Sequence, residues 1–220
     1  MKSKIIVTAD ESKTLLIPEL NETYHSTKGA LAEALHIFIK EGLLFANKNN
    51  LSIFEMGFGT GLNAILTFDS ALSQGIKIQY DTIEKYPLQF EKVSQLDYLE
   101  IASLTHRKKE YKLMFETECY PISLDSKFLF NLMIGDLKSQ TLDHHKYDII
   151  FFDAFGPKVQ ANLWTEEIMR KCFNTLKKGG FLVTYCAQGQ FKRNLKAVGF
   201  EVECIPGPPG KREMTRAFKH

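Results

Sequence analysis

Cysteine and tryptophan are scarce in this chain of 220 residues, which has four cysteines and one tryptophan. Cys119, Cys172, Cys186 and Cys204 are widely separated, form no Cys-x-x-Cys pair and have no histidine nearby at ligand spacing. Such a pattern is typical neither of a disulfide framework nor of a structural zinc site. We therefore expect a protein without a bound metal.

Long apolar runs are also missing. No stretch approaches the roughly 20 apolar residues that cross a bilayer. The N-terminal MKSKIIVTADESK begins with a basic residue, but its apolar stretch is too short for a signal peptide. With 44% hydrophobic residues, the chain can bury one good core. We expect a soluble, cytoplasmic protein with no membrane partner.

A large excess of either charge is absent, since the formal net charge is only +2. Basic residues are nevertheless concentrated: residues 189–220 hold seven Lys or Arg against three Glu, and HRKKEYK occupies positions 106–112. Basic segments on a nearly neutral protein suit a polyanionic partner such as RNA. Ordinary solvated surface explains them as well, so charge alone leaves the partner open.

Strand and helix patterns alternate from residue 51 onward, which predicts a mostly parallel sheet with helices on both faces. The expected strands are 51–56, 77–84, 128–136, 147–155, 181–187, 200–205 and 212–218, the last antiparallel at the edge. The expected helices are 61–74, one through 90–93, 165–177 and 190–198, and Thr165 is the expected N-cap of the third. The pattern therefore predicts an α/β fold with seven strands.

The first 47 residues have a different pattern: KIIVTADESKTLLIP is typical of a hairpin, and residues 28–41 of a helix. We expect residues 1–47 to form an extension that packs on the core or covers its ligand site. Residues 48–220 would then form the catalytic domain. Residues 97–127 have weak periodicity, and we interpret them as an insertion without an assigned role.

Three alternate glycines follow the first predicted strand, in the stretch IFEMGFGTGLNAILTF at 53–68. Glycines at this place let a ligand approach the backbone and the start of the next helix. A dinucleotide site would need a further glycine at position 62, which is Leu62. Together with the preceding acid, Glu55, the spacing favours S-adenosylmethionine over a nicotinamide cofactor.

Acidic residues end three successive predicted strands. Glu55 can hold the aminoacyl ammonium of S-adenosylmethionine directly or through water, Glu84 the ribose hydroxyls, and Asp136 the adenine amino group. Three acids would repel a pyrophosphate. Each of them alone could be a loop acid or a helix cap, so the prediction depends on the ordered set.

Asp153 follows the fourth strand, in FFDAFGPKVQANLW. In this architecture its loop borders the sulfonium methyl, so Asp153 would face the methyl acceptor. Capping of the turn at Gly156–Pro157 explains its position equally well.

The chain resembles the methyltransferase half of the bacterial bifunctional MnmC-type enzymes, which complete 5-methylaminomethyl-2-thiouridine at the tRNA wobble position. The resemblance covers nearly the whole chain and lies in TYHSTKGALAEALHIFI, EMGFGTGLNAILTF, IEKYPL, GDL, DAFGPKVQANLWT, GGFLVTYCAQGQFKRNLKAVGF and GKREM. It implies a Rossmann-like class I methyltransferase fold, and methyl transfer from S-adenosylmethionine to the amine of 5-aminomethyl-(2-thio)uridine. It also implies that the flavin-dependent oxidase half is absent here, so that another activity supplies the amine.

Site residues follow from the same resemblance, with Asp153 as the catalytic residue. The implied cofactor-binding residues are Glu55, Gly57, Phe58, Gly59, Gly61, Glu84, Lys85, Asp136, Leu137 and Asp153. We predict tRNA phosphate contacts at Lys192, Arg193, Lys211 and Arg212, and base stacking at Phe155, Tyr24 or Trp164. For Trp164 a structural contact with Met169 is the alternative. We interpret His25 and His36 as structural residues or as part of a lid over the cofactor, and assign neither a catalytic role.

The expected partner is the anticodon loop of tRNA, bound by a monomer. Two rival functions stay open at this point. One is methylation of a small free amine, with the basic clusters merely solvated. The other is a non-catalytic RNA-binding module, against which the complete set of acids and glycines argues.

Overall fold

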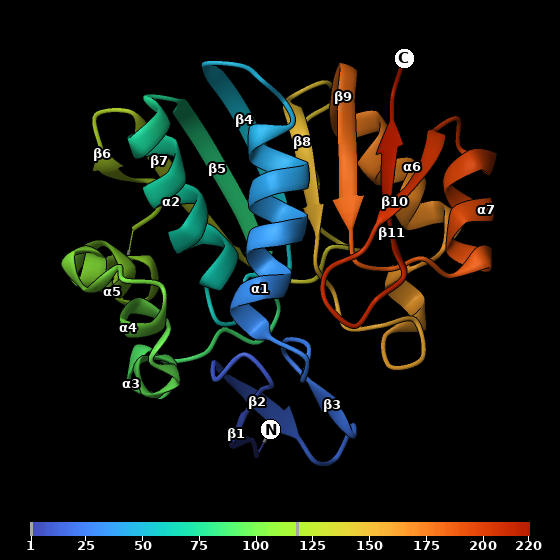
Figure 1. Cartoon of the computed structure of the whole chain (residues 1–220). Helices are drawn as coiled ribbons and strands as arrows, with labels where there is room; N and C mark the ends of the chain where they lie inside the picture. Colours follow the sequence, from blue (N-terminus) through green and yellow to red (C-terminus); the bar gives the residue numbers. More distant parts are fainter. Residues whose placement is uncertain (1, 118) are drawn as a thin grey trace.

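A computed structural model describes residues 2–117 and 119–220 (Figure 1). Its main sheet has eight strands in the order β10-β11-β9-β8-β4-β5-β7-β6. The strands are β4 (Asn50–Met56), β5 (Lys77–Glu84), β6 (Ile122–Asp125), β7 (Phe128–Ile134), β8 (Tyr147–Phe152), β9 (Leu176–Thr184), β10 (Glu201–Pro206) and β11 (Glu213–Phe218). Strands β7, β5, β4, β8 and β9 pair in parallel, while β6 and β11 run antiparallel to their neighbours.

The predicted α/β fold is confirmed, and each of the seven predicted strands is present. The sheet has one strand more than predicted, because β6, from the weakly periodic segment 97–127, pairs with β7. The predicted place of the last strand was wrong, since β11 lies between β9 and β10 and the edge strand is β10. Met214 to Ala217 in β11 are all buried, whereas β10 is mostly exposed, and the interior position therefore falls to β11.

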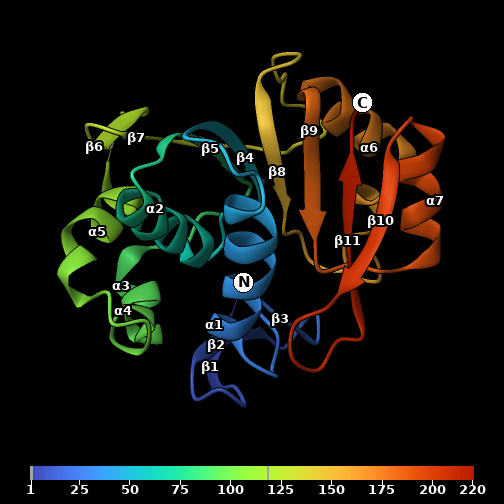
Figure 2. The same ribbon diagram turned by 45° about the horizontal axis from the view of Figure 1, so that its top comes forward.

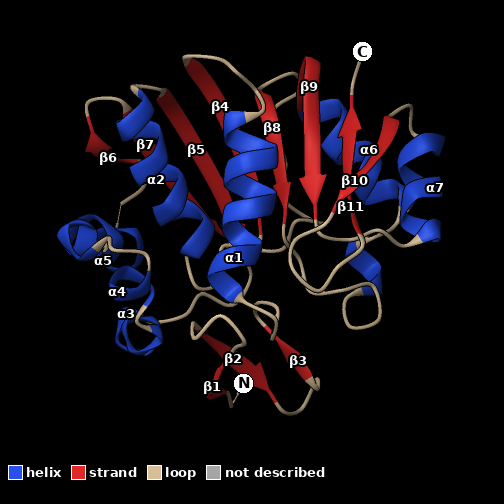
Figure 3. Cartoon of the chain, in the orientation of Figure 1, coloured by secondary structure: helices blue, strands red, loops and turns tan. Residues whose placement is uncertain are grey.

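Helices cover both faces of the sheet (Figure 3). Helix α1 (Ala30–Ala34), continued by η1 (Leu35–Leu44), packs with α2 (Leu62–Gln74) on one face. Helices α6 (Glu166–Thr175) and α7 (Gly189–Ala197) pack on the other. Successive residues of β4 alternate between the two cores, with Ile53 in one and Phe54 in the other.

Short helices connect the remaining parts of the chain. They are α3 (Phe90–Val93), η2 (Ser94–Leu96), α4 (Tyr98–Ile101), η3 (Thr105–Arg107), α5 (Lys108–Glu116) and η4 (Ala161–Leu163). The Thr165 side chain accepts a hydrogen bond from the Ile168 amide, as predicted for an N-cap. Among the helices formed by residues 2–117 and 119–220, none combines the length and apolarity needed to span a bilayer.

The N-terminal segment forms a second, antiparallel sheet of β1 (Lys4–Val7), β2 (Lys13–Ile17) and β3 (Glu22–Thr23). This small sheet lies at the end of the main sheet toward which β8 and β9 point (Figure 1). Helix α1 with η1 belongs to the main core, where Phe38 contacts Phe151 with ring centroids 5.2 Å apart. The division of the chain at residue 47 stays a prediction.

The loop between β10 and β11 lies beside the start of α1 (Figure 2). A Cβ atom on Gly210 would lie 2.7 Å from the Lys28 side chain, so the two segments are in close contact. The N- and C-terminal parts of the chain therefore meet near the carboxyl ends of the strands.

Candidate active site

A cavity of about 800 Å³ opens at the carboxyl ends of the parallel strands. Its lining comes from the glycine loop after β4, from the ends of β5, β7 and β8, and from the N-terminal segment. The predicted residues among them are Gly57, Phe58, Gly59, Glu84, Lys85, Asp136, Leu137, Asp153, Phe155 and Tyr24. Segments far apart in the sequence thus meet at one site, as expected for an open parallel sheet.

The backbone of the glycine loop is held tightly against its neighbours. Gly57 has φ of +93°, and a Cβ atom there would lie 2.6 Å from the Asp153 carbonyl oxygen. The Gly57 amide donates to the Ile83 carbonyl at 3.1 Å, and the Gly59 amide to the Glu84 carboxylate at 3.0 Å. Because Gly57 has no Cβ atom, the glycine loop can lie this close to the backbone of Asp153.

Gly61 does not line the cavity. It has φ of +70°, and a Cβ atom there would lie 2.9 Å from the ring of Phe115 and 3.0 Å from that of Phe58. The third glycine lets two aromatic rings pack against the start of α2.

Glu84 and Asp136 are anchored at the ends of β5 and β7. Glu84 accepts hydrogen bonds from the Gly59 amide and, at 2.9 Å, from the Tyr86 amide. Asp136 accepts from the Lys138 amide at 2.9 Å and pairs with Lys85, whose Nζ lies 3.0 Å away. The backbone hydrogen bond from Lys138, and then Lys85, lower the pKa of Asp136. These bonds hold the carboxylates of Glu84 and Asp136 in a fixed orientation at the cavity.

Asp153 is half-buried at the cavity wall. Its Oδ2 accepts a hydrogen bond of 2.8 Å from the Asn63 amide, and its own backbone amide donates to the Met56 carbonyl. Burial, and then the charge of Glu33, raise the pKa of Asp153 to about 7, against the opposing effects of Asn63 and Lys211. A carboxylate with such a pKa can accept a proton near neutral pH.

Glu55 lies behind the glycine loop and does not line the cavity. Its side chain is fully buried, and Thr82 Oγ1 donates to its Oε2 at 2.7 Å. Burial raises the pKa of Glu55 to about 8, so the side chain is mostly protonated at pH 7. The structure therefore separates Glu55 from Glu84 and Asp136, which the sequence had grouped with it.

The aromatic residues predicted to stack on a base differ in their exposure. Phe155 is at the cavity, where its ring lies 5.1 Å from that of Tyr24 at 74°. Trp164 is buried against Phe152 and Phe191, and its Nε1 donates to the Phe155 carbonyl at 2.8 Å. Trp164 therefore has a structural position, in which it supports the loop that carries Phe155. Its contacts with Phe152 and Phe191 account for its burial without a contact with Met169.

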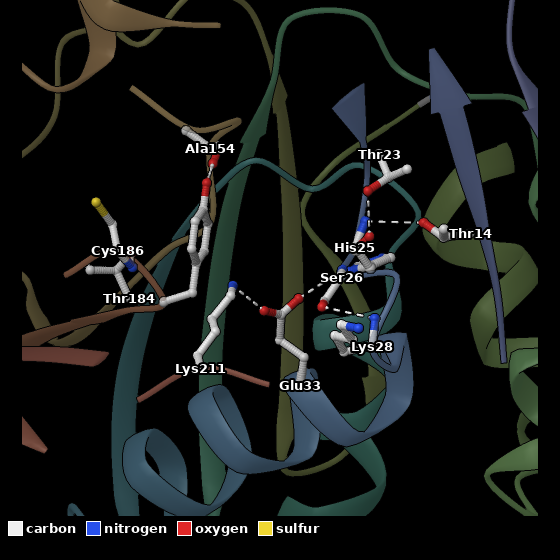
Figure 4. Close-up of polar contacts among 11 residues, drawn as sticks. Thr14, Thr23, His25, Ser26, Lys28, Glu33, Ala154, Thr184, Cys186 and Lys211 are labelled. Atoms are coloured by element: carbon white, nitrogen blue, oxygen red, sulfur yellow. Dashed lines mark hydrogen bonds and ion pairs between the residues drawn. The ribbon is translucent and has the colours of Figure 1, made fainter. Parts of the chain in front are cut away.

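The four predicted phosphate contacts also differ. Lys211 forms an ion pair with Glu33 of α1 (Figure 4), and its Nζ lies 4.1 Å from the centre of the Tyr185 ring. Lys192 pairs with Glu213 at 3.1 Å, and Arg193 donates to Gln190 at 2.7 Å. Arg212 is exposed. The structure brings Lys211 near the site but engages it in an internal pair.

Sequence reasoning missed two polar residues of the site, Asn63 and Glu33, and gave His25 no catalytic role. Asn63 donates a hydrogen bond to Asp153, and the charge of Glu33 raises the pKa of Asp153. His25 lines the cavity, and its Nε2 lies 2.7 Å from Thr60 Oγ1. Burial lowers the pKa of His25 to about 4, so that the ring is neutral at pH 7. Asn63 directly follows the glycine loop in GTGLN, a position that could have identified it.

Comparison with known proteins fits this geometry. Residues 99–220, more than half of the chain, match the family model of S-adenosyl-L-methionine-dependent methyltransferases. The chain belongs to this family. Its cofactor is therefore S-adenosyl-L-methionine, and its activity is methyl transfer.

The curated relatives of this methyltransferase are longer proteins. It is 30% identical to the tRNA 5-methylaminomethyl-2-thiouridine biosynthesis bifunctional protein MnmC of Leptospira interrogans, over 95% of this chain and 34% of that protein. Identity to MnmC of Cupriavidus metallidurans is 29%, over 91% of this chain and 32% of that protein. The chain thus spans about a third of the length of these relatives.

Solved structures share the fold of this methyltransferase. MnmC2 from Aquifex aeolicus superposes with a TM-score of 0.76 at 24% identity, over 99% of this chain and 70% of that one. Spermidine synthase from Thermotoga maritima gives 0.53 at 16% identity, over 100% and 72%.

The residues present fit the cofactor. At the cavity, the two glycines of positive φ, Gly57 and Gly59, expose backbone where a Cβ atom would intrude. Glu84 and Asp136 supply acceptors on neighbouring strand ends, and the cavity is large enough for a nucleoside with an aminoacyl side chain.

Proposed function

We propose that this methyltransferase methylates the primary amine of 5-aminomethyl-(2-thio)uridine at the wobble position of tRNA. The names of the MnmC relatives support this substrate, and one observation on the site carries the chemistry. Asp153 presents a carboxylate at the cavity, beside the glycine loop and without an ion-pair partner among the residues that the structure describes. A cationic amine would find there both a counter-charge and a proton acceptor.

The chemical task is to deprotonate the amine. An aliphatic amine has a pKa near 10, so at pH 7 about 4 kcal/mol separates the ammonium from the nucleophilic neutral form. When bound, S-adenosylmethionine supplies the electrophilic methyl group and a sulfonium charge that disfavours a neighbouring ammonium.

Asp153 carries this step through the oxygen that Asn63 leaves free. Among the described residues, Asn63 is the hydrogen-bond donor to the carboxylate, and it uses Oδ2. Oδ1 can therefore accept an N–H of the amine, orient its lone pair and take the proton.

The other predicted residues receive supporting roles in this proposal. Glu84 would accept from the ribose hydroxyls and Asp136 from the adenine amino group, with Phe58, Lys85 and Leu137 as walls of the cofactor pocket. Phe155 and Tyr24 would stack on the wobble base at the cavity mouth, which requires the nucleotide to leave its stack. Arg212 and Arg193, with Lys192 and Lys211, would contact phosphates of the anticodon loop. We place this activity in the cytoplasm and assign it to a monomer.

Mass spectrometry of tRNA nucleosides tests the substrate directly. The purified protein is incubated with S-adenosylmethionine and tRNA that carries 5-aminomethyl-2-thiouridine. We expect a nucleoside heavier by one methyl group, and no product on tRNA whose wobble uridine lacks the aminomethyl group. Methylation of small free amines with inert tRNA would replace this proposal by the rival activity.

A further inference from the structure

An ion pair between two distant segments lies beside the cavity. Glu33 on α1 is buried, and one of its carboxylate oxygens pairs with Lys211 in the loop between β10 and β11 (Figure 4). Its other oxygen accepts a hydrogen bond of 2.9 Å from the Ser26 amide. Neither Glu33 nor Lys211 lines the cavity. The pair therefore joins the N-terminal segment to the β10–β11 loop from outside the ligand site.

Lys211 connects this pair to the Asp153 loop, residues 153–156. Its Nζ lies 4.1 Å from the centre of the Tyr185 ring, within the range of a cation–π contact. The Tyr185 hydroxyl in turn donates to the Ala154 carbonyl at 2.8 Å. Ala154 directly follows Asp153, so a displacement of Tyr185 would also displace the backbone that carries the Asp153 carboxylate.

Ser26 connects the same pair to the facing wall of the cavity. It lies two residues after Tyr24, whose ring lies 5.1 Å from that of Phe155. A Cβ atom on Gly59 would lie 3.1 Å from the Tyr24 ring, which therefore also borders the glycine loop. Through its two carboxylate oxygens, Glu33 thus reaches both walls between which the acceptor would sit.

We propose that Glu33 and Lys211 are positioning residues, which hold the Asp153 loop and the Tyr24 segment at a fixed separation across the cavity. Both charges lie close enough to act on Asp153: beside the larger effect of burial, Glu33 raises the pKa of this carboxylate and Lys211 lowers it. Their effect on methyl transfer rests on the proposed function, whereas the link between the two segments does not.

Lys211 then acts within the protein and does not contact a phosphate. Its transfer to a phosphate would leave the buried Glu33 carboxylate without its cation, and an unpaired buried charge is costly. The phosphate contacts of the proposed function are then Lys192, Arg193 and Arg212.

Neutral variants of both residues test the pair. We expect Lys211→Met and Glu33→Gln each to lower kcat for the aminomethyl tRNA by about 10- to 100-fold, because a displacement of about 1 Å can cost this much. The double variant, which has no unpaired charge, should lose no more than the worse single variant. Lys211→Arg keeps the charge and should retain most of the activity. Wild-type kcat in Lys211→Met, or losses that multiply in the double variant, would overturn the proposal.

Tyr185→Phe tests the link to the Asp153 loop while the ring is retained. Loss of the hydroxyl should lower kcat by about tenfold and leave the affinity for S-adenosylmethionine in calorimetry unchanged. Tyr120→Phe is the matched control, because the Tyr120 hydroxyl also donates to a backbone carbonyl at 2.8 Å, that of Met114, and Tyr120 does not line the cavity. Equal kcat in the wild type and Tyr185→Phe would show that the hydroxyl does not position Asp153.

The salt dependence of tRNA binding separates the two possible roles of Lys211. A lost phosphate contact would reduce the slope of log K against log salt by about 0.7 to 0.9. We expect the slope of Lys211→Met to equal that of the wild type. A reduced slope would contradict an internal role and assign Lys211 to the RNA path.

Hydrogen exchange gives a readout that does not need the tRNA. The Phe155 amide donates to the Gln160 side chain at 3.0 Å and reports on the order of the Asp153 loop. Its exchange should become about tenfold faster in Tyr185→Phe and in the double variant, and stay unchanged in Tyr120→Phe. If tRNA proves inert but this exchange rises, the proposed function fails and the link stands. Unchanged exchange in both variants would overturn the link, whether or not tRNA is methylated.

Discussion

The two ends of the sheet treat buried acids in opposite ways. At the amino end, Asp148 pairs with Lys177 at 2.7 Å and Lys48 at 3.0 Å. In the middle of β5, Asp81 pairs with Lys146, just before β8, at 2.8 Å and accepts from the Tyr147 hydroxyl at 2.6 Å. Lysines thus neutralise both buried carboxylates.

At the carboxyl end, the partly exposed Asp136 pairs with Lys85 at 3.0 Å, but Glu55, Glu84 and Asp153 form no ion pair within the described residues. The nearby Lys211 pairs with Glu33 instead. The pKa values of Glu55 and Asp153 are accordingly raised by burial. We interpret this difference as a division between acids that serve stability and acids that, in our proposal, meet a cationic ligand and accept a proton.

The largest expected effect is at Asp153. Replacement by alanine should leave folding and cofactor binding intact and lower kcat by about 100- to 10,000-fold, the range of a lost general base. Single-turnover methyl transfer measures this loss. Near-normal turnover in Asp153→Ala would contradict the catalytic role of Asp153. The acids at the two ends of the sheet would then not differ in function.

At the amino end a comparable change should affect stability alone. Lys146→Met leaves the buried Asp81 carboxylate without its cation, which should cost about 3 kcal/mol. Urea unfolding measures the cost, and kcat at a temperature well below unfolding should stay that of the wild type. A loss of kcat in the folded Lys146→Met protein would mean that the two ends are not separate in function.

The raised pKa of Asp153 predicts an opposite stability effect at the carboxyl end. Its folded value of about 7 exceeds the ordinary 3.8, so the charge of Asp153 destabilises the fold progressively as pH rises from about 4 to 7. Asp153→Asn should therefore gain up to about 4 kcal/mol over the wild type at pH 8 relative to pH 4, at about 1.36 kcal/mol for each pKa unit. Thermal unfolding at both pH values measures this gain. A gain in stability at pH 4 but not at pH 8 would contradict a raised pKa of Asp153.

Arg212→Ala should give the smallest effect. As an exposed phosphate contact, Arg212 would contribute about 0.7 to 0.9 to the slope of log K against log salt. Titration of tRNA at several salt concentrations measures the slope, with Arg170→Ala on α6 as the control. An unchanged slope in Arg212→Ala would remove the β10–β11 loop from the RNA path.

Local patterns were sufficient to predict much of this molecule. The strands, the Thr165 cap, and the positions of Gly57, Glu84, Asp136 and Asp153 at one edge all follow from periodicity and turn chemistry. The interior position of β11 was not predicted, because β11 contains Arg216 and arginine side chains are seldom buried. In the fold, Arg216 is buried, pairs with Glu203 at 2.9 Å and covers the Phe45 ring at 3.4 Å.

Contacts between distant residues could not be predicted in this way. The pair of Glu33 and Lys211 joins positions 178 residues apart, and Asn63 reaches Asp153 across 90 residues. Which residue faces the cavity could not be predicted from spacing either. Glu55 and Gly57 are two residues apart, a spacing that places side chains on the same face of a strand, yet only Gly57, in the loop after β4, lines the cavity.

A crystal structure with S-adenosylmethionine bound tests the central claim most directly. Our account predicts the sulfonium methyl opposite Asp153, with room for one nitrogen at about 3 to 3.5 Å from the methyl carbon. That nitrogen position should lie within hydrogen-bond reach of Asp153 Oδ1. A methyl group directed away from Asp153, toward Glu84 or Asp136, would contradict the account.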